Sequence, residues 1–267
     1  MSSEDAGLVV AGVSKTYGTK DGRTLALDDV DLRVPKGRFV TVIGPSGCGK
    51  STLLRIIAGL DPPDRGEVSI FGESAEFARR AKHIGFVPQA LALLPWRTVL
   101  ENTQLPLTLN RSADTLRTEP TRDPVDLLRA FGLGDVLGRR PAELSGGMRQ
   151  RVAIARSFVH EPAVLLMDEP FSSLDELTSE VLRRELLDLW QSARTTVVFV
   201  SHSVSEAVLL SDEVIVMTRA PGKIAARIEV RLDRPRGDLV EVTGEFREVE
   251  RQVRLALRGA PAGGGLP

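Results

Sequence analysis

The sequence predicts an α/β fold with a mainly parallel sheet and a helical insert, and three features of the chain support that class. A β-branched apolar run, a glycine-rich loop and a helical pattern follow one another within residues 38–59. Short apolar runs then alternate with helical patterns, as they do in parallel sheets. The stretch 90–159 has the spacing of helices, so we expect it to form an insert in the α/β core.

Strands are expected where short apolar runs are bounded by turn residues. Two of them flank the polar turn TYGTKDGR at 16–23, and another follows the turn DPPDRG at 61–66. The expected strands are 8–13, 24–34, 40–43, 67–71, 84–87, 163–167, 195–200 and 213–218.

Helices are expected where apolar residues recur every three or four positions. The first follows the glycine-rich loop, and the others are 99–109, 123–131, a helix opened by 144–147, 176–190, 203–210 and 245–257. We interpret the polar stretch 110–122 as a loop, 234–236 as a linker and 259–267 as a flexible tail. The main domain is placed at 7–232, followed by a C-terminal segment at 233–267.

Composition excludes several classes of protein. The 35 basic and 36 acidic residues leave a net charge of -1 without a long basic block, so we expect no nucleic-acid partner. The start MSSEDAGLVV lacks the pattern of a secretory signal, and no uncharged apolar run approaches the roughly 18 residues that span a bilayer. If the protein serves a membrane, we expect it to act from outside the lipid.

The glycine-rich loop reads G-x-x-x-x-G-K-S from Gly44 to Ser51, a pattern typical of phosphate binding. Glycines let successive N–H groups turn toward phosphate oxygens, and the start of the next helix adds its positive end. Lys50 is placed to meet the β and γ phosphates, and the Ser51 hydroxyl to ligate Mg²⁺. The alternative is a chance glycine turn. The candidate nucleotide-binding residues of this phosphate loop are Gly44, Pro45, Ser46, Gly47, Cys48, Gly49, Lys50, Ser51 and Thr52.

Cys48 is the only cysteine, so an intramolecular disulfide is excluded and a reducing compartment suits the chain. Near phosphates its thiol could have a lowered pKa and react with alkylating agents. The alternative is that Cys48 is a small residue filling the loop.

Two adjacent carboxylates, Asp168 and Glu169, end the apolar run AVLLM. The carboxyl ends of parallel strands form the crevice in which open α/β sheets bind ligands. Asp168 would then hold Mg²⁺, while Glu169 would polarise the attacking water. The alternative is a solvated acidic turn.

Gln89 and His202 each follow an expected strand. The Gln89 amide is placed to touch Mg²⁺ and the water, and His202 to contact the γ-phosphate, whereas solvated or structural side chains are the alternatives. Tyr17, the only tyrosine, could stack on a purine base or be an ordinary half-exposed aromatic residue, and spacing alone does not decide.

The segment LSGGMRQ at 144–150 opens a helix with a serine and two glycines, so its N-terminus is a second anion site or only a capped helix. Together with GPSGCGKS, Gln89, LLMDE, SSLD at 172–175 and His202, it resembles the ATP-binding subunits of ABC transporters. The resemblance covers about residues 8–231. It implies a P-loop NTPase core with an antiparallel β subdomain, and it implies ATP and Mg²⁺ as cofactors.

The resemblance also implies a head-to-tail dimer, in which Ser145 and Gly147 of one subunit contact the γ-phosphate held by the other. Tyr17 matches the adenine-stacking aromatic of the family, and Asp175 matches the turn that crosses the dimer interface. The residues implied to bind nucleotide outside the phosphate loop are Tyr17, Ser145, Gly146, Gly147, Gln150 and Asp175.

A finer resemblance, to importers of nitrate, sulfonates and taurine, comes from ALALLPWRTVLEN at 90–102, MTRAPGKI at 217–224, and RPR followed by EF at 245–246. SSLDELT and the polar stretch 110–122 depart from that branch. The branch implies a peripheral subunit on the cytoplasmic face of the membrane that energises import of small anions. Its partners would be permease subunits and, indirectly, a periplasmic or extracellular substrate-binding protein.

We expect the permease to dock near Gln89 and 94–98, where Trp96 is either exposed for docking or part of the core. Other functions in the same superfamily are DNA repair, action on ribosomes, or transport of another substrate. Repair members carry long coiled coils and ribosome-acting members usually two cassettes, and this sequence has neither.

Overall fold

The computed structural model describes residues 6–19, 22–109, 121–237 and 239–259. The chain forms two compact units, one from residues 1–75 and 196–267 and the other from residues 76–195. Each unit is described by itself below. The predicted helical insert lies inside the second unit, and the boundary proposed near residue 232 stays a prediction.

The first unit contains an antiparallel sheet with the strand order β2-β1-β4-β5. Its strands are β1 (Ala6–Thr19), β2 (Gly22–Pro35), β4 (Arg65–Ile70) and β5 (Glu73–Ser74). The polar turn predicted at 16–23 is wrong at both ends, where the residues belong to strands: Tyr17 pairs with Thr24 and Gly18 with Arg23. Cross-strand pairing extends the hairpin into residues whose local preference favours a turn.

The same unit contains a second set of strands in the order β10-β9-β3-β8. They are β3 (Phe39–Ile43), β8 (Thr196–Ser201), β9 (Glu213–Met217) and β10 (Ile224–Glu229). β3 lies between β8 and β9, parallel to both, and all five of its residues are buried. β10 was not predicted, although its half-buried and exposed residues alternate as in a strand with one covered face.

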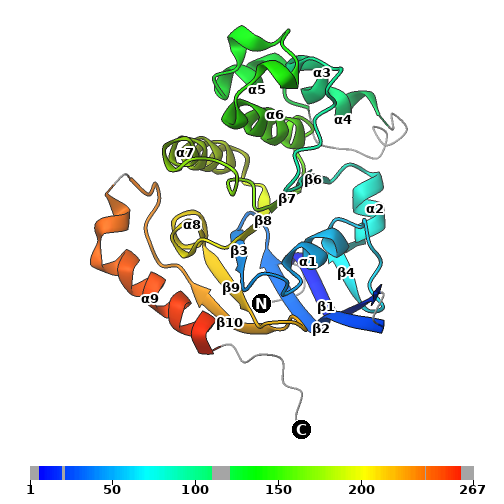
Figure 1. The fold of residues 1–267 in the computed structure, drawn as a ribbon, viewed down its shortest axis with the longest axis vertical. Helices are drawn as coiled ribbons and strands as arrows, with labels where there is room; N and C mark the ends of the chain where they lie inside the picture. The colour runs from blue at the N-terminus through cyan, green and yellow to red at the C-terminus, as the bar shows by residue number, and fades with distance from the viewer. Residues whose placement is uncertain (1–5, 20–21, 110–120, 238, 260–267) are drawn as a thin grey trace. The chain divides into compact units, whose positions relative to one another are not determined.

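The α-helices of the first unit, in the part of the chain that the structure describes, are α1 (Lys50–Ile57), α8 (Val204–Leu210) and α9 (Gly244–Gly259). A short 3₁₀ turn, η5 (Val240–Val242), precedes α9. Apolar side chains of α9 pack against β10 and α8, and Figure 1 shows α9 running beside β10. The predicted C-terminal helix is therefore confirmed.

The second unit pairs β6 (Ile84–Val87) with β7 (Val164–Asp168) in parallel register. Its other elements within the described residues are helical, which confirms the predicted insert. They are α2 (Ala75–Arg80), α3 (Val99–Thr103), α4 (Leu105–Thr108), α5 (Pro124–Ala130), η3 (Gly134–Val136), η4 (Pro141–Glu143), α6 (Gly146–Phe158) and α7 (Glu176–Ala193). Most of the loop predicted at 110–122 lies outside the described residues. In the described ranges, no helix combines the length and apolarity that crossing a bilayer requires.

Gly85, in the middle of β6, lies close to the C-terminal part of α6. A Cβ atom at Gly85 would lie 2.5 Å from the Ser157 carbonyl oxygen and 2.9 Å from Pro162 Cγ. Backbone cannot yield as a flexible side chain can, so this position requires glycine.

We predict that Gly85→Ala lowers the free energy of unfolding by about 1–3 kcal/mol, because the new methyl group overpacks the contact with α6. Denaturant unfolding followed by circular dichroism measures the change. Gly138→Ala is the matched control, since nothing lies within 4 Å of a Cβ atom there. Equal stability of the two variants would show that β6 and α6 are not packed this closely.

Candidate nucleotide-binding site

The phosphate loop leaves the carboxyl end of the central strand of the first unit. Ile43, the last residue of β3, is in register with Ser201 of β8 and Val216 of β9. His202 follows Ser201 directly, so parallel pairing brings the loop and His202 to the same edge of the sheet. This is the edge at which open α/β sheets bind ligands.

Two glycines give the loop its conformation. Gly47 and Gly49 have φ angles of 76° and 94°, in the left-handed region that favours glycine. A Cβ atom at Gly49 would lie 2.7 Å from Leu27 Cδ2 and 2.8 Å from the Ala26 carbonyl oxygen. Gly49 is also the residue that precedes α1 as its N-cap, so this turn aims the first N–H groups of the helix at the loop.

The Lys50 side chain lies inside the loop, where only 7 % of the residue is exposed. Its ammonium donates to the carbonyl oxygens of Gly44 at 2.9 Å and Pro45 at 3.2 Å. Among the described residues of its own unit, no carboxylate forms an ion pair with it. A buried cation with only neutral acceptors favours an incoming anion, so the loop fits a polyphosphate.

Cys48 fills the interior of the same loop. It is 1 % exposed, and burial raises the pKa of its thiol although the nearby Lys50 charge opposes that change. Of the two interpretations of Cys48, the reactive thiol with a lowered pKa is not supported. The alternative, a small residue that fills the loop, is confirmed.

Tyr17 lies on β1 with 36 % of its surface exposed. Its hydroxyl donates to Asp61 Oδ2 at 3.2 Å, and the Lys15 ammonium lies 5.6 Å from the ring centroid. A hydrogen bond from Arg55 is the main cause that lowers the pKa of Asp61, so that acceptor stays ionised. The ring is thus fixed at its polar end while part of it remains accessible for stacking.

The second unit brings Gln89, Asp168 and Glu169 together. Val87 of β6 pairs with Met167 of β7, and the Gln89 amide donates to Glu169 Oε2 at 3.2 Å. Asp168 is 7 % exposed, whereas Glu169 is half-buried and has a φ of 47°. A positive φ is uncommon for glutamate, and it turns the chain sharply at the end of β7.

The N-termini of α6 and α7 lie against each other in the same unit. Ser145 accepts a hydrogen bond from Met148 N at 3.2 Å and caps α6. Asp175 caps α7 by accepting from the Thr178 backbone at 3.0 Å and from its hydroxyl at 2.8 Å, and these bonds lower its pKa. A Cβ atom at Gly147 would lie 2.6 Å from Thr178 Cγ2, so glycine permits this contact.

The remaining predicted residues differ in exposure. Ser51 and Ser145 are exposed and Thr52 and Gly146 half-buried, whereas Gln150 is only 1 % exposed. Gln150 Nε2 has no hydrogen-bond partner among the described residues. In this structure Gln150 faces the interior of the second unit.

Sequence reasoning missed two side chains that hold the predicted residues in place. The Arg156 guanidinium donates to the carbonyl oxygens of Leu91 at 2.6 Å and Ala92 at 2.8 Å, just after Gln89. Glu206 accepts from Ser201 Oγ at 2.6 Å, beside His202. The spacing Ser203-x-x-Glu206 is a helix-start signal that could have pointed to Glu206, whereas no local pattern marks Arg156.

The donors available for a metal ion are oxygen atoms. No group of three or more His, Cys, Asp or Glu side chains gathers anywhere in the described ranges. Mg²⁺ is usually held by one or two protein oxygens together with substrate phosphates and water. The Ser51 hydroxyl and the Asp168 carboxylate are therefore suitable in kind.

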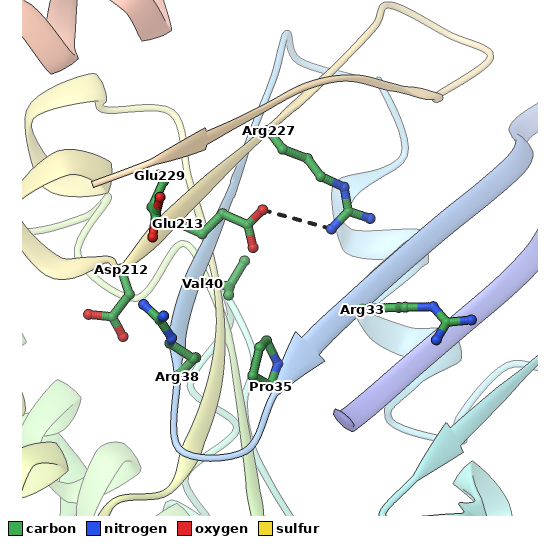
Figure 2. A pocket seen from close by; sticks show the side chains of 8 residues that line it. All are labelled: Arg33, Pro35, Arg38, Val40, Asp212, Glu213, Arg227 and Glu229. Atoms are coloured by element: carbon green, nitrogen blue, oxygen red, sulfur yellow. Dashed lines mark ion pairs between the residues drawn. The ribbon is translucent and has the colours of Figure 1, made fainter. Parts of the chain in front are cut away.

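A separate pocket of about 510 Å³ opens at the opposite end of β3 (Figure 2). Figure 2 shows Arg38 beside Asp212 and the ion pair between Arg227 and Glu213, which spans 3.8 Å. The lining residues are Arg33, Pro35, Arg38, Val40, Asp212, Glu213, Arg227 and Glu229. None belongs to the phosphate loop, which leaves the other end of the strand.

A family model described as ABC transporter matches residues 27–172, more than half of the chain. The chain belongs to the ABC transporter family. It is an ATP-binding cassette of that family and an ATPase. The matched range contains the phosphate loop, Gln89, the segment 144–150 and the carboxylates after β7.

Relatives of this ABC cassette match over most of their length. The aliphatic sulfonates import ATP-binding protein SsuB of Bacillus cereus is 42 % identical over 90 % of the chain and 92 % of the relative. The nitrate import ATP-binding protein NrtD of Synechococcus elongatus is 42 % identical over 84 % of the chain and 81 % of the relative. The taurine import ATP-binding protein TauB of Rhizobium johnstonii is 40 % identical over 94 % of the chain and 96 % of the relative.

Solved structures agree with this assignment. The dimeric structure of a bacterial ABC transporter cassette matches with a TM-score of 0.72 and 33 % identity, over 85 % of this chain and 100 % of that one. A post-hydrolysis state of the same cassette, bound to ADP and inorganic phosphate, matches equally well. The predicted P-loop ABC ATPase fold is confirmed.

We predict that native Cys48 resists alkylation. Because its pKa is raised, less thiolate is present at pH 8 than in an exposed cysteine, and burial blocks access. Iodoacetamide should react at least about tenfold more slowly with the folded chain than with the chain in guanidinium chloride. The folded rate should rise as the pH approaches the raised pKa. Equal rates in the two states would contradict the buried position.

Proposed function

We propose that this ABC ATPase energises an importer of small anions such as sulfonates, nitrate or taurine. The observation that carries its ATP-binding half is the buried Lys50 ammonium, which has only neutral acceptors in its own unit. The importer half is supported by the three relatives named for aliphatic sulfonate, nitrate and taurine import. These names favour import over the DNA-repair and ribosomal alternatives.

In this proposal the phosphate loop binds the β and γ phosphates of ATP. The N–H groups of residues 47–52 and the Lys50 ammonium compensate the negative charge, and Tyr17 stacks on the adenine. Ser51 and Asp168 would hold Mg²⁺, and Gln89 would contact it. When bound, the ion neutralises charge on the phosphate oxygens.

Glu169 is proposed as the general base. Phosphoryl transfer depends on positioning and charge stabilisation, so a carboxylate that orients the attacking water is what the reaction needs. The Gln89 amide already donates to Glu169 at 3.2 Å, which ties the orientation of the base to the segment that follows β6. His202 would donate to the γ-phosphate from the carboxyl end of β8.

A second copy of the chain is proposed to complete each reaction centre. Ser145 is exposed at the N-terminus of the 13-residue helix α6, whose positive end and free N–H groups suit a phosphate. Asp175 is exposed at the start of α7. The dimeric structures of a similar cassette support a dimer, and its head-to-tail arrangement is part of the proposal.

The permease is proposed to dock at residues 94–98. Trp96 is 67 % exposed, so the alternative that it belongs to the core is not supported. The buried Asn102 amide donates to the carbonyl oxygens of Leu94, Arg97 and Thr98, on both sides of Trp96 in the chain, at 3.0–3.1 Å. This loop is therefore a fixed surface, and an exposed aromatic residue on a fixed surface suits an interface.

In the cell we propose a peripheral position on the cytoplasmic face of the membrane, with a substrate-binding protein acting on the permease from the other side. Cargo would pass through the permease only. The chemistry of the cargo is therefore inferred from the relatives, and not from side chains of this chain.

We predict that Glu169→Gln lowers kcat for ATP hydrolysis at least about 100-fold, because the amide cannot accept a proton from water. The dissociation constant for ATP should change by no more than about twofold, since the phosphate loop is untouched. Phosphate release and equilibrium binding measure the two effects. Glu180→Gln, an exposed carboxylate on α7 at 3.7 Å from Arg184, is the control. Rapid hydrolysis by Glu169→Gln would remove Glu169 from this role.

We predict that Trp96→Glu abolishes transport while the isolated subunit hydrolyses ATP normally, because the new charge must be buried in the interface. Uptake of labelled sulfonate, nitrate or taurine into vesicles containing the assembled importer measures the first effect. Leu109→Glu, which alters another exposed apolar side chain of the second unit, is the control. Unchanged transport by Trp96→Glu would place the permease elsewhere.

A further inference from the structure

Two arginines that follow the last strand bind the C-terminal end of α8. Arg234 Nη2 donates to the Leu210 carbonyl oxygen at 2.6 Å. Arg236 Nη1 donates to those of Val208 at 2.9 Å and Leu209 at 2.6 Å. The last carbonyls of a helix lack partners within it and carry partial negative charge. Both cations therefore lie where they stabilise α8.

Both guanidinium groups are largely buried, and burial affects their charge. Burial, followed by repulsion from Arg234, lowers the pKa of Arg236 to about 10. Burial also lowers the pKa of Arg234, and the Asp212 carboxylate opposes that change. A buried guanidinium needs acceptors to replace its lost water. The helix carbonyls supply acceptors for Arg236 Nη1, whereas Arg236 Nε has no partner among the described residues.

Asp212 connects the same segment to β3. Arg234 Nε donates to Asp212 Oδ1 at 3.0 Å, while the Phe39 backbone donates to Asp212 Oδ2 at 2.9 Å. Asp212 N in turn donates to the Phe39 carbonyl oxygen at 2.7 Å. Because Phe39 begins the strand that ends at the phosphate loop, Arg234 is bonded to α8 and, through Asp212, to β3.

The helix that follows, α9, also packs against α8. Phe246 and Val253 of α9 are 1 % and 0 % exposed, in one apolar cluster with Val204 and Val208 of α8. Ile43, the residue before the phosphate loop, belongs to the same cluster. We call Arg234, Arg236, Phe246 and Val253 the C-terminal clamp.

The opposite end of α8 holds His202. Glu206, in the first turn of α8, accepts from Ser201 Oγ at 2.6 Å, and its N–H donates to Ser203 Oγ at 3.3 Å. Ser203 N also donates to Ser201 Oγ at 2.9 Å. His202 therefore lies between two residues that are bonded to α8, and a shift of that short helix moves it.

We propose that the C-terminal clamp positions His202 through α8 and so sets the rate of ATP hydrolysis. This inference rests on the proposed contact of His202 with the γ-phosphate. The hydrogen bonds of Arg234 and Arg236 described above go to Asp212 and to the end of α8, so we expect the clamp to act on the chemical step more than on nucleotide affinity. The clamp residues are positioning residues.

The test is Arg236→Gln in the full-length chain. Loss of the charge frees the end of α8, so kcat should fall about ten- to a hundredfold. KM for ATP should stay within about twofold of the wild-type value. In the nucleotide-free protein the NMR signal of the His202 ring should shift. The chain has three histidines, and comparison with His202→Ala assigns that signal.

Arg231→Gln is the matched control. The Arg231 side chain is 84 % exposed and pairs with Glu229 at 2.8 Å, so its loss should change neither kcat nor the His202 signal. If Arg236→Gln is unfolded by circular dichroism, Arg236→Lys and Val253→Ala serve for the same measurements. Lysine keeps the charge without the planar pair of donors, so its kcat should lie between those of wild type and Arg236→Gln.

Two results would overturn the proposal: a kcat for Arg236→Gln equal to that of the control, or a reduced kcat with an unmoved His202 signal. Wild-type ATP hydrolysis by His202→Ala would instead contradict the proposed contact of His202 with the γ-phosphate. In that case the His202 signal of Arg236→Gln still decides whether the clamp positions the ring.

Discussion

A buried ammonium group, with neutral acceptors among the described residues of its own unit, is the constraint on which the nucleotide site depends. Lys50 is enclosed by its own loop, and two carbonyl oxygens are its acceptors. β3, paired on both sides with parallel strands, holds that loop at one edge of the sheet. A rigid strand, left-handed glycines and a helix N-terminus thus present fixed donors, so binding a phosphate requires little reorganisation.

Each unit of the chain contains a different set of the predicted site residues. The first supplies the phosphate cradle, Tyr17 and His202, and the second supplies the carboxylates and the paired N-termini of α6 and α7. The packing of Gly147 against Thr178 joins these N-termini, so they form a single surface of the second unit. In the proposed dimer this surface would contact the nucleotide that is bound by the phosphate loop of the other copy.

Much of this could be predicted from the sequence, because glycine loops, helix starts and apolar strands are local signals. The phosphate loop, the helical insert and the end of β7 followed from such signals. The extended β1–β2 hairpin did not, since pairing partners far apart in the chain decide it. The buried state of Cys48 and the bonds of Arg156 and Arg236 also depend on distant carbonyls or packing. Arg234 and Arg236, which lie in the segment predicted as a linker, instead donate hydrogen bonds to carbonyl oxygens of α8.

The most direct test of the account is the mass of the Glu169→Gln variant in solution, with and without ATP. A centre shared by two copies predicts a monomer that becomes a dimer when ATP is added, and a chain that stays monomeric when Ser145→Arg is added to the variant. Dimerisation that is indifferent to Ser145→Arg, or a Glu169→Gln chain that stays monomeric at saturating ATP, would contradict a reaction centre completed by a second copy.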